Sequence, residues 1–282
     1  MKKEVETPAS VPHGGPYVIG RDPDLFRPSV LSNGLSDGVP AGGGGRLRHR
    51  AVACRPYCLR CSVPLEPMSQ LFTRVLLARH GEVHDRWRRS IYGRWDVELS
   101  DVGQEQSQRL GVELAGVHLD AVVSSGLQRA EAAAAEVRAN RPAGPLPRID
   151  DPRFLELDRG DWAGKTVDEL ERDDPDEYAL WIAERGAVRA PGGESPAEVA
   201  ERVVPALDHW AAQHPGGAVL VVAHLWVVRS AVAAALGLPM ARSGSLALPP
   251  GGICSFQWPV QDGSEGAVWR PPLLSGFGLA EA

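Results

Sequence analysis

The sequence lacks any apolar run that approaches the roughly 18 residues of a membrane-spanning helix. It begins Met1-Lys2-Lys3, but no apolar stretch follows these lysines, so no secretory signal is predicted. We therefore expect a cytoplasmic protein with no membrane partner.

Lysine is also scarce, because only 3 of the 30 basic residues are lysines. The net charge of −6 argues against general nucleic-acid binding. Arginine is abundant throughout the chain, so its count alone does not predict phosphate binding. With 282 residues, 43% hydrophobic and 23% charged, the chain is long enough for one large domain, alone or with a tail.

Cysteine is limited to four residues, and three of them lie close together at Cys54, Cys58 and Cys61. Their C-x3-C-x2-C spacing lacks the fourth ligand of a zinc or cluster site, which His49 or Cys254 could supply. Unpaired thiols in a loose segment are the simpler interpretation. We therefore predict no metal and no other cofactor.

Two regions of the chain differ in composition. Residues 1–70 contain nine glycines and nine prolines, a level typical of low complexity, and show no helical or strand periodicity. We expect them to form a disordered extension. Residues 71–282 have the pattern of an α/β domain, and Met68 is a candidate for its true start.

Three short apolar segments predict buried strands at Val75–Ala78, Ala121–Ser124 and Ala218–Ala223. Right-handed helical crossovers would make these strands parallel and bring their carboxyl ends to one edge of a sheet. Capping and periodicity place the intervening helices at 101 to about 115, 127–139, after the Thr166-x-x-Glu169 capping box, 196 to about 212, and 225–236. Short edge strands are predicted at 253–258 and 267–269.

Each predicted strand is followed by a side chain that can handle phosphate. The first runs into Arg79 and His80, the second leads to Arg129, and the third runs into His224. Arginine forks orient phosphate oxygens, and a neutral imidazole can attack phosphorus and carry it covalently. A second histidine can stabilise the transferring group as its charge spreads. These residues together predict phosphoryl transfer.

Phosphoryl transfer also needs an acid that protonates the leaving oxygen. Glu156 is the candidate, because the apolar residues within 154–162 would desolvate it and so favour a protonated carboxyl group. Asp158 and Asp161 are the alternatives, which the pattern places in a solvated loop.

The order of these motifs resembles the histidine phosphatase superfamily, which has the phosphoglycerate mutase-like fold. That family carries Arg-His-Gly-Glu, then Gly-x-x-Asp-x-x-Leu-Ser/Thr-x-x-Gly, Ser-x-Leu-x-Arg-Ala, Glu-x-x-x-Gly-x-Trp-x-Gly, Gly-Glu-Ser and a hydrophobic strand into His. The six matching elements stand, in the same order, at Arg79–Glu82, Gly93–Gly103, Ser125–Ala130, Glu156–Gly164, Gly193–Ser195 and Val219–His224.

The resemblance implies a three-layer α/β/α sandwich with a mostly parallel central sheet and no requirement for a metal. It implies that His80 is the phosphorylated nucleophile and Glu156 the proton donor. It also implies that Arg79 and Arg129 hold the phosphate and that His224 completes the pocket.

Two positions depart from the family pattern. Family members usually carry threonine after Arg-His-Gly-Glu and a phosphate-contacting asparagine three residues later, where this chain has Val83 and Arg86. Arg86 is the candidate to replace that asparagine. The usual Gly-Gly after the second histidine is Leu225-Trp226, which would narrow one wall of the pocket.

Several neighbouring residues have two interpretations. Arg86, Arg88 and Arg89 either grip a second anionic part of the substrate or form a solvated loop surface. Trp87 and Trp226 either line the pocket or serve ordinary packing.

The motifs favour a phosphomonoesterase that acts on a small phosphorylated metabolite through phosphohistidine, as a monomer or homodimer. A mutase is the alternative, but mutases of the family usually carry more than the 36 residues found between Glu156 and Gly193. A non-catalytic phosphate binder is a third possibility, which the complete set of motifs argues against. The segment 81–100 is similar to phosphatases that act on α-ribazole phosphate, and also to broad-specificity and sugar-phosphate members.

Overall fold

A computed structural model describes residues 72–184, 188–260 and 271–277 of the chain. The predicted extension at 1–70, with its three clustered cysteines, lies outside the described residues, and so does the strand predicted at 267–269. Within the described part, no helix is long and apolar enough to cross a bilayer.

A six-stranded sheet forms the centre, with strand order β3-β2-β4-β1-β5-β6. The first four strands in this order are parallel, whereas β5 runs antiparallel to β1, and β6 runs antiparallel to β5. The three strands predicted as buried are confirmed as the adjacent trio β2, β4 and β1. The strand bounds are β1 Phe72–Arg79, β2 Ala121–Ser124, β3 Ile149–Asp150, β4 Ala218–Ala223, β5 Ile253–Pro259 and β6 Leu273–Phe277.

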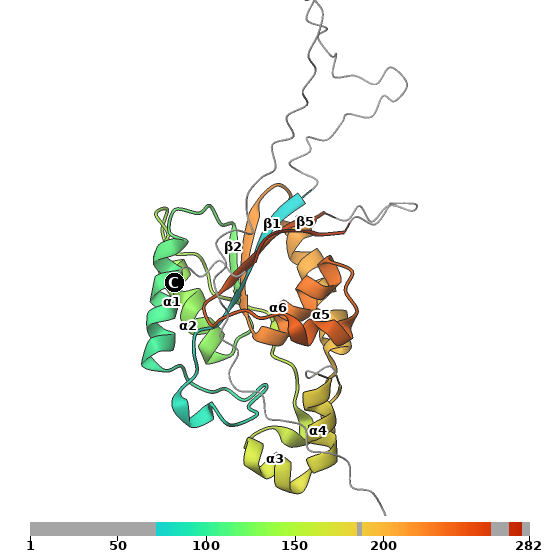
Figure 1. The fold of residues 1–282 in the computed structure, drawn as a ribbon. Helices are drawn as coiled ribbons and strands as arrows, with labels where there is room; N and C mark the ends of the chain where they lie inside the picture. The colour runs from blue at the N-terminus through green and yellow to red at the C-terminus, as the bar shows by residue number, and fades with distance from the viewer. Residues whose placement is uncertain (1–71, 185–187, 261–270, 278–282) are drawn as a thin grey trace, which may run out of the picture. The chain divides into compact units, whose positions relative to one another are not determined.

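Two pairs of helices cover the two faces of the sheet, so the predicted three-layer α/β/α sandwich is confirmed (Figure 1). Helices α1 and α2 cover one face and α5 and α6 the other, while α3 and α4 pack around Trp162 in a smaller cluster. The helix bounds are α1 Asp101–Glu113, α2 Gln128–Ala139, α3 Val167–Asp173, α4 Pro175–Ala183, α5 Pro196–Gln213 and α6 Leu225–Ala235. Short 3-10 helices lie at Asp85–Trp87, Pro152–Phe154, Gly160–Trp162 and Met240–Ser245.

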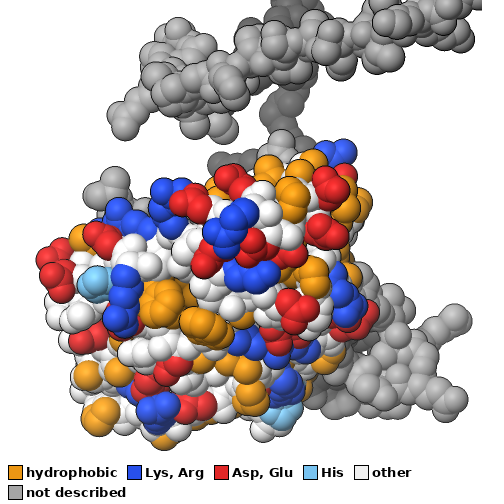
Figure 2. Space-filling model, turned by 90° about the horizontal axis from the view of Figure 1, so that it is seen from below, with side chains coloured by type: hydrophobic (Ala, Val, Ile, Leu, Met, Phe, Trp, Pro, Cys, Tyr) orange, Lys and Arg blue, Asp and Glu red, His pale blue; other side chains and the backbone are white. Residues whose placement is uncertain are grey.

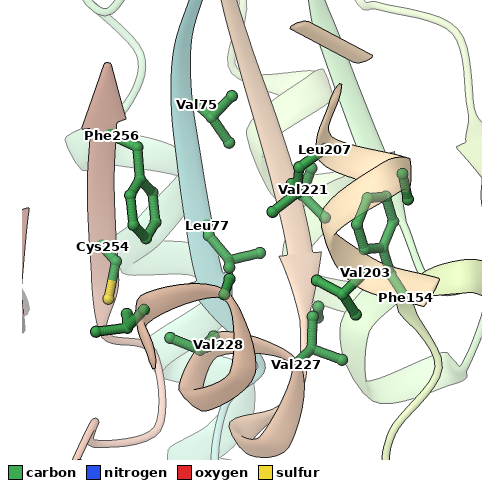
Figure 3. Close-up of a cluster of buried hydrophobic side chains, with 14 of the residues drawn as sticks. Val75, Leu77, Phe154, Val203, Leu207, Val221, Val227, Val228, Cys254 and Phe256 are labelled. Atoms are coloured by element: carbon green, nitrogen blue, oxygen red, sulfur yellow. The ribbon is translucent and has the colours of Figure 1, made fainter. Parts of the chain in front are cut away.

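Alternate residues of β1 point into different cores. Val75 and Leu77 pack toward α5 and α6, in the cluster drawn in Figure 3, whereas Leu76 and Ala78 pack toward α1 and α2. Because both faces of the sheet are covered, its central strands are continuous apolar runs rather than alternating patterns.

The predicted helix starts are present. Ser100 caps α1 by accepting a hydrogen bond from the backbone N–H of Gly103 at 3.0 Å. The capping boxes opened by Thr166 and Ser195 are both complete, at α3 and α5. Gly237 follows α6 with a φ of +62°, a conformation that glycine adopts without strain.

The prediction that residues 253–258 form an edge strand was wrong. This segment is β5, which hydrogen-bonds to β1 on one side and to β6 on the other. Its side chains Phe256 and Trp258 are fully buried, as an interior strand requires. The sheet edge is β6, whose exposed residues alternate with half-buried ones.

Candidate active site

The carboxyl ends of β1 and β4 bring the two predicted histidines together. In the parallel register, Arg79 lies beside Ala223, so His80 and His224 are the next residues on adjacent strands. Their ring centroids are 5.1 Å apart, and both side chains are buried. Strand pairing alone therefore creates a two-histidine site.

A small cavity of about 140 Å³ opens beside His80, and neither His224 nor Arg129 is among its lining residues. Since one water occupies about 30 Å³ in the liquid, the cavity has room for about five waters, enough for a phosphoryl group and a few neighbouring atoms. Its lining residues are Arg79, His80, Ser90, Ile91, Tyr92, Gly93, Glu156, Arg159, Leu225 and Trp226.

His80 is held in one tautomer by its own loop. Its Nδ1 lies 2.6 Å from the carbonyl oxygen of Gly81, which can only accept, so Nδ1 carries the proton and Nε2 keeps its lone pair. Burial, followed by the positive charges of Arg129 and Arg79, holds the pKa of His80 well below its ordinary value. The ring is therefore neutral at physiological pH, with a lone pair on Nε2 of the kind that nucleophilic attack requires.

His224 is anchored on one nitrogen and unpartnered on the other. Its Nε2 lies 2.8 Å from the Ser125 hydroxyl, while its buried Nδ1 has no hydrogen-bond partner among the described residues. Burial, and then the positive charge of Arg129, keep its pKa well below the ordinary value. A buried ring nitrogen with no partner is free to meet a ligand.

Arg79 and Arg129 are also buried close to the histidines. Arg79 donates through Nη1 to the carbonyl of Leu248, and Arg129 donates through its two Nη atoms to the carbonyls of Trp95 and Gly93. The Nε atoms of both are buried without acceptors, and neither guanidinium pairs with a carboxylate in the described part of the chain. Burial lowers the pKa of each.

Glu156 lines the same cavity with only 7% of its surface exposed. Its Oε1 accepts from the backbone N–H groups of Leu157 and Trp226, at 2.9 and 3.2 Å, and no described residue donates to Oε2. Oε2 can therefore carry a proton. The alternative acids do not line the cavity: Asp158 accepts from Gly160 and Arg94, and Asp161 is exposed.

A cluster of ion pairs holds the Glu156 loop from behind and explains the Gly-Glu-Ser motif. Glu194 accepts from Arg94 at 2.7 Å and from Arg202 at 3.0 and 3.1 Å, and it also accepts the backbone N–H of Asp158. Both arginines donate in addition to the backbone carbonyl of Glu156. Sequence patterns marked the motif but gave no role for its glutamate.

Glycine is required where the His80 loop meets the start of α1. A Cβ on Gly81 would lie 2.3 Å from the carbonyl oxygen of Gly103, and a Cβ on Gly103 would lie 2.0 Å from that of Glu82. The two backbones can approach this closely only without side chains. This contact fixes the His80 loop against the first turn of α1.

Arg86 lies on the surface rather than in the cavity. Its side chain is 62% exposed and forms a 2.6 Å ion pair with Glu98. Arg88 and Arg89 are similarly exposed and pair with nearby carboxylates, which matches the solvated-loop interpretation of this segment. Trp87 donates to Glu98, away from the cavity, whereas Trp226 is a pocket residue.

Arg159 was not among the predicted site residues. It lines the cavity, has only 9% of its surface exposed, and makes no hydrogen bond or ion pair from its guanidinium to any described residue. The guanidinium carbon lies 5.1 and 5.6 Å from the ring centroids of Trp181 and Trp226. An arginine beside Asp158 and Asp161 resembles a loop charge in sequence, so no local signal identified it.

The outer surface at the carboxyl end of β1 has mixed charge. Figure 2 views the molecule from below, the direction in which β1 runs in Figure 1, and acidic, basic and hydrophobic side chains are interspersed over it. Among the residues the structure describes, no group of three or more His, Cys, Asp or Glu could hold a metal ion. Cys254, one of the two residues that could have supplied a fourth ligand, is buried in the core on β5.

Comparison with known proteins identifies the family of this chain. The model of the histidine phosphatase superfamily (branch 1) matches residues 75–265. Phosphoserine phosphatase 1 of Hydrogenobacter thermophilus is 32% identical over 169 residues, 60% of this chain and 79% of that protein. Glucosyl-3-phosphoglycerate phosphatase of Mycolicibacterium vanbaalenii is 31% identical over 206 residues, 70% of this chain and 82% of that protein.

Solved structures agree with the fold. YhfR of Bacillus stearothermophilus superposes with a TM-score of 0.61 at 30% identity, covering 68% of this chain and 92% of that one. Both of the relatives described above are named as phosphatases, in accord with the predicted hydrolase class. The fold, the paired histidines and the family match lead to one conclusion: the chain belongs to the histidine phosphatase superfamily.

Proposed function

We propose that the protein is a phosphomonoesterase that transfers the phosphoryl group of a small phosphate ester to His80 and then to water. One observation carries the proposal. The Nδ1–H of His80 is committed to the carbonyl of Gly81, which leaves Nε2 as a neutral, buried nucleophile at the wall of a phosphate-sized cavity.

In the first step, Nε2 of His80 attacks phosphorus and the bond from phosphorus to the ester oxygen breaks. Arg79 and Arg129 stabilise the phosphoryl oxygens, and their buried Nε–H groups lack other acceptors. Glu156 gives the proton on Oε2 to the departing alkoxide, which leaves as an alcohol.

His224 stabilises the group in transfer. If the Ser125 hydroxyl donates to Nε2, the proton of the neutral ring lies on Nδ1, the buried nitrogen that has no other partner. That N–H would donate to a phosphoryl oxygen as negative charge spreads over the transferring group.

In the second step, water attacks the phosphorus of phospho-His80. Glu156, now a carboxylate, accepts a proton from that water, the P–N bond breaks, and inorganic phosphate leaves with neutral His80 restored. The two carbonyl-anchored arginines remain in place through both steps, since their Nη contacts are to the backbone.

The relatives above 30% identity are named for phosphoserine and for glucosyl-3-phosphoglycerate, so a small phosphorylated metabolite is the expected substrate class. Arg86 would have to leave Glu98 to reach such a substrate. The α-ribazole and sugar phosphates suggested by the loop motif belong in the same substrate panel.

The test is phosphoenzyme trapping. The wild-type protein, rapidly quenched with p-nitrophenyl phosphate, should carry one phosphoryl group on the peptide that contains His80, and should release phosphate in EDTA. The His80→Ala variant should show neither. A peptide that stays unmodified during turnover would contradict the proposal, and interconversion of phosphoglycerates without phosphate release would identify a mutase instead.

A further inference from the structure

The cations around the cavity outnumber what one phosphate needs. Arg79 and Arg159 line it, Arg129 is buried beside it against the ring of Tyr92, and Glu156 is the one carboxylate among the lining residues. A phosphate monoester brings a charge of about −1.5 to −2 at neutral pH. Because Glu156 must be protonated in the first step, roughly one positive charge is left without a counter-charge when the ester binds.

Arg159 is the buried cation that has no role in the proposed mechanism. Its Nη1 is buried and has no acceptor among the described residues, and its guanidinium has no ion pair there. Burying an arginine without a partner is costly, so the buried position of Arg159 points to a ligand that supplies the missing acceptor. Arg79 and Arg129 differ, because backbone carbonyls anchor both.

Arg159 is held by aromatic rings rather than by hydrogen bonds. Trp181 of α4 and Trp226 of α6 contact its guanidinium, at 5.1 and 5.6 Å from the ring centroids. A guanidinium stacked on rings keeps its N–H edge available for planar acceptors such as carboxylate or phosphate. The guanidinium carbon of Arg229 also lies 4.7 Å from the ring centroid of Trp226. Burial, together with the positive charges of Arg79 and Arg159, lowers the pKa of Arg229 to about 10.

The departure from the family pattern now has a structural reason. Where the family usually has Gly-Gly after its second histidine, Trp226 forms one wall of the cavity and supports Arg159. The backbone N–H of Trp226 donates to Glu156 at 3.2 Å, so this platform is tied directly to the acid. The unusual tryptophan and the unpartnered arginine therefore form one unit.

We propose that Arg159, supported by Trp181 and Trp226, binds a second anionic group of the substrate, so that preferred esters carry a carboxylate or a further phosphate near the scissile phosphate. This inference rests on the proposed phosphatase function. It narrows the substrate class from small phosphate esters in general to compact metabolites with two anionic groups, of the phosphorylated-acid type.

Two matched pairs of esters test it. O-phosphoserine and phosphoethanolamine differ only in the carboxylate, and so in effect do 3-phosphoglycerate and glycerol 3-phosphate. Wild type should favour the carboxylated member of each pair by about 10–100-fold in kcat/KM, the size expected for a charge-assisted hydrogen bond. Arg159→Met should bring both ratios close to one, and Arg159→Lys should lie between. A bisphosphate in the panel separates a second phosphate from a carboxylate as the preferred group.

Arg172→Met is the control, because Arg172 is exposed on α3 and pairs only with Asp173. It should leave both ratios unchanged. Equal loss by Arg159→Met on all esters, or unchanged ratios, would overturn the inference.

Binding keeps the test independent of turnover. Calorimetry on the His80→Ala protein should show tighter binding of O-phosphoserine than of phosphoethanolamine, and the Arg159→Met change should remove that difference. If no ester is hydrolysed but this difference is present, the proposed function fails while the second-anion site stands. If the two esters bind equally, the site is refuted.

Discussion

Arginine has opposite roles in the cavity and in the ion-pair cluster behind it. At the cavity, Arg79 and Arg159 line the wall and Arg129 is buried beside it, and none of the three pairs with a carboxylate in the described part of the chain. Behind it, Arg94 and Arg202 converge on Glu194, and every one of these groups is hydrogen-bonded. The difference separates a charge reserved for ligand from a charge used to hold a loop.

Physical chemistry explains why the two arrangements lie side by side. An unpaired buried charge destabilises the fold but binds an incoming anion strongly, because the surroundings are already desolvated. The Glu194 cluster fixes Glu156 through the carbonyl oxygen of Glu156 itself, so the backbone that carries this carboxyl group is held in position. Replacing matched residues in the two regions can test this division.

The largest effect is expected from Glu156→Gln in the cavity. The amide keeps the shape but cannot donate the proton, so kcat/KM on an alkyl ester such as glycerol 3-phosphate should fall by about 10²–10⁴-fold. The loss on p-nitrophenyl phosphate should be smaller, because that leaving group departs with little help. Equal losses on both esters would mean that Glu156 positions the site rather than donating the proton.

Glu194→Gln, the same substitution in the ion-pair cluster, should instead reduce stability. Burial raises the pKa of Glu194, but the hydrogen bonds from Arg202 outweigh this and the net pKa is lowered, so the cluster stabilises the fold above acidic pH and loses that contribution as pH falls. The free energy of unfolding should drop by about 1–3 kcal/mol in urea titrations at pH 7. Glu156→Gln is the control, and a larger stability loss from it would reverse the comparison.

Arg159→Met, unlike Glu194→Gln, should increase the free energy of unfolding. Methionine fills the space between Trp181 and Trp226 without an uncompensated charge, and this gain exceeds the lost cation–π contacts. We expect the free energy of unfolding to rise by about 1 kcal/mol while the preference for carboxylated esters is lost. Arg202→Met should lower stability, and a fall with Arg159→Met would show that the guanidinium is structural.

The smallest expected effect is that the imidazole rings of His80 and His224 do not titrate in the folded protein. Because burial and nearby cations hold the pKa values of His80 and His224 well below the ordinary range, their ring NMR signals should not move between pH 8 and about 6. In urea both should titrate near about 6.5. Since the unfolded chain then binds more protons, stability should decline as pH falls below that value. The His80→Ala variant identifies the signals, and titration of the folded rings near 6.5 would contradict the assigned environment.

Local patterns predicted most of the sheet and the ends of its strands. The apolar runs that became β1, β2 and β4, and the capping residues Ser100 and Ser195, act over a few neighbouring residues and need no distant partner. The same patterns did not predict β3, α4 or the edge strand β6. A two-residue strand and an exposed edge have too little periodicity, and the interior position of β5 depends on partners far along the chain.

The sequence by itself predicted that His80 and His224 would follow parallel strands and lie at one edge of the sheet, because right-handed crossovers make such strands parallel. Only the tertiary structure decided that β1 and β4 are neighbours and which arginines line the cavity. Arg86 follows the nucleophile in sequence but pairs with Glu98 at the surface, whereas Arg159 is placed by Trp181 and Trp226, which come from two other helices. Whether a charge is paired, stacked or left for a ligand depends on residues brought together by folding, and no local pattern encodes that.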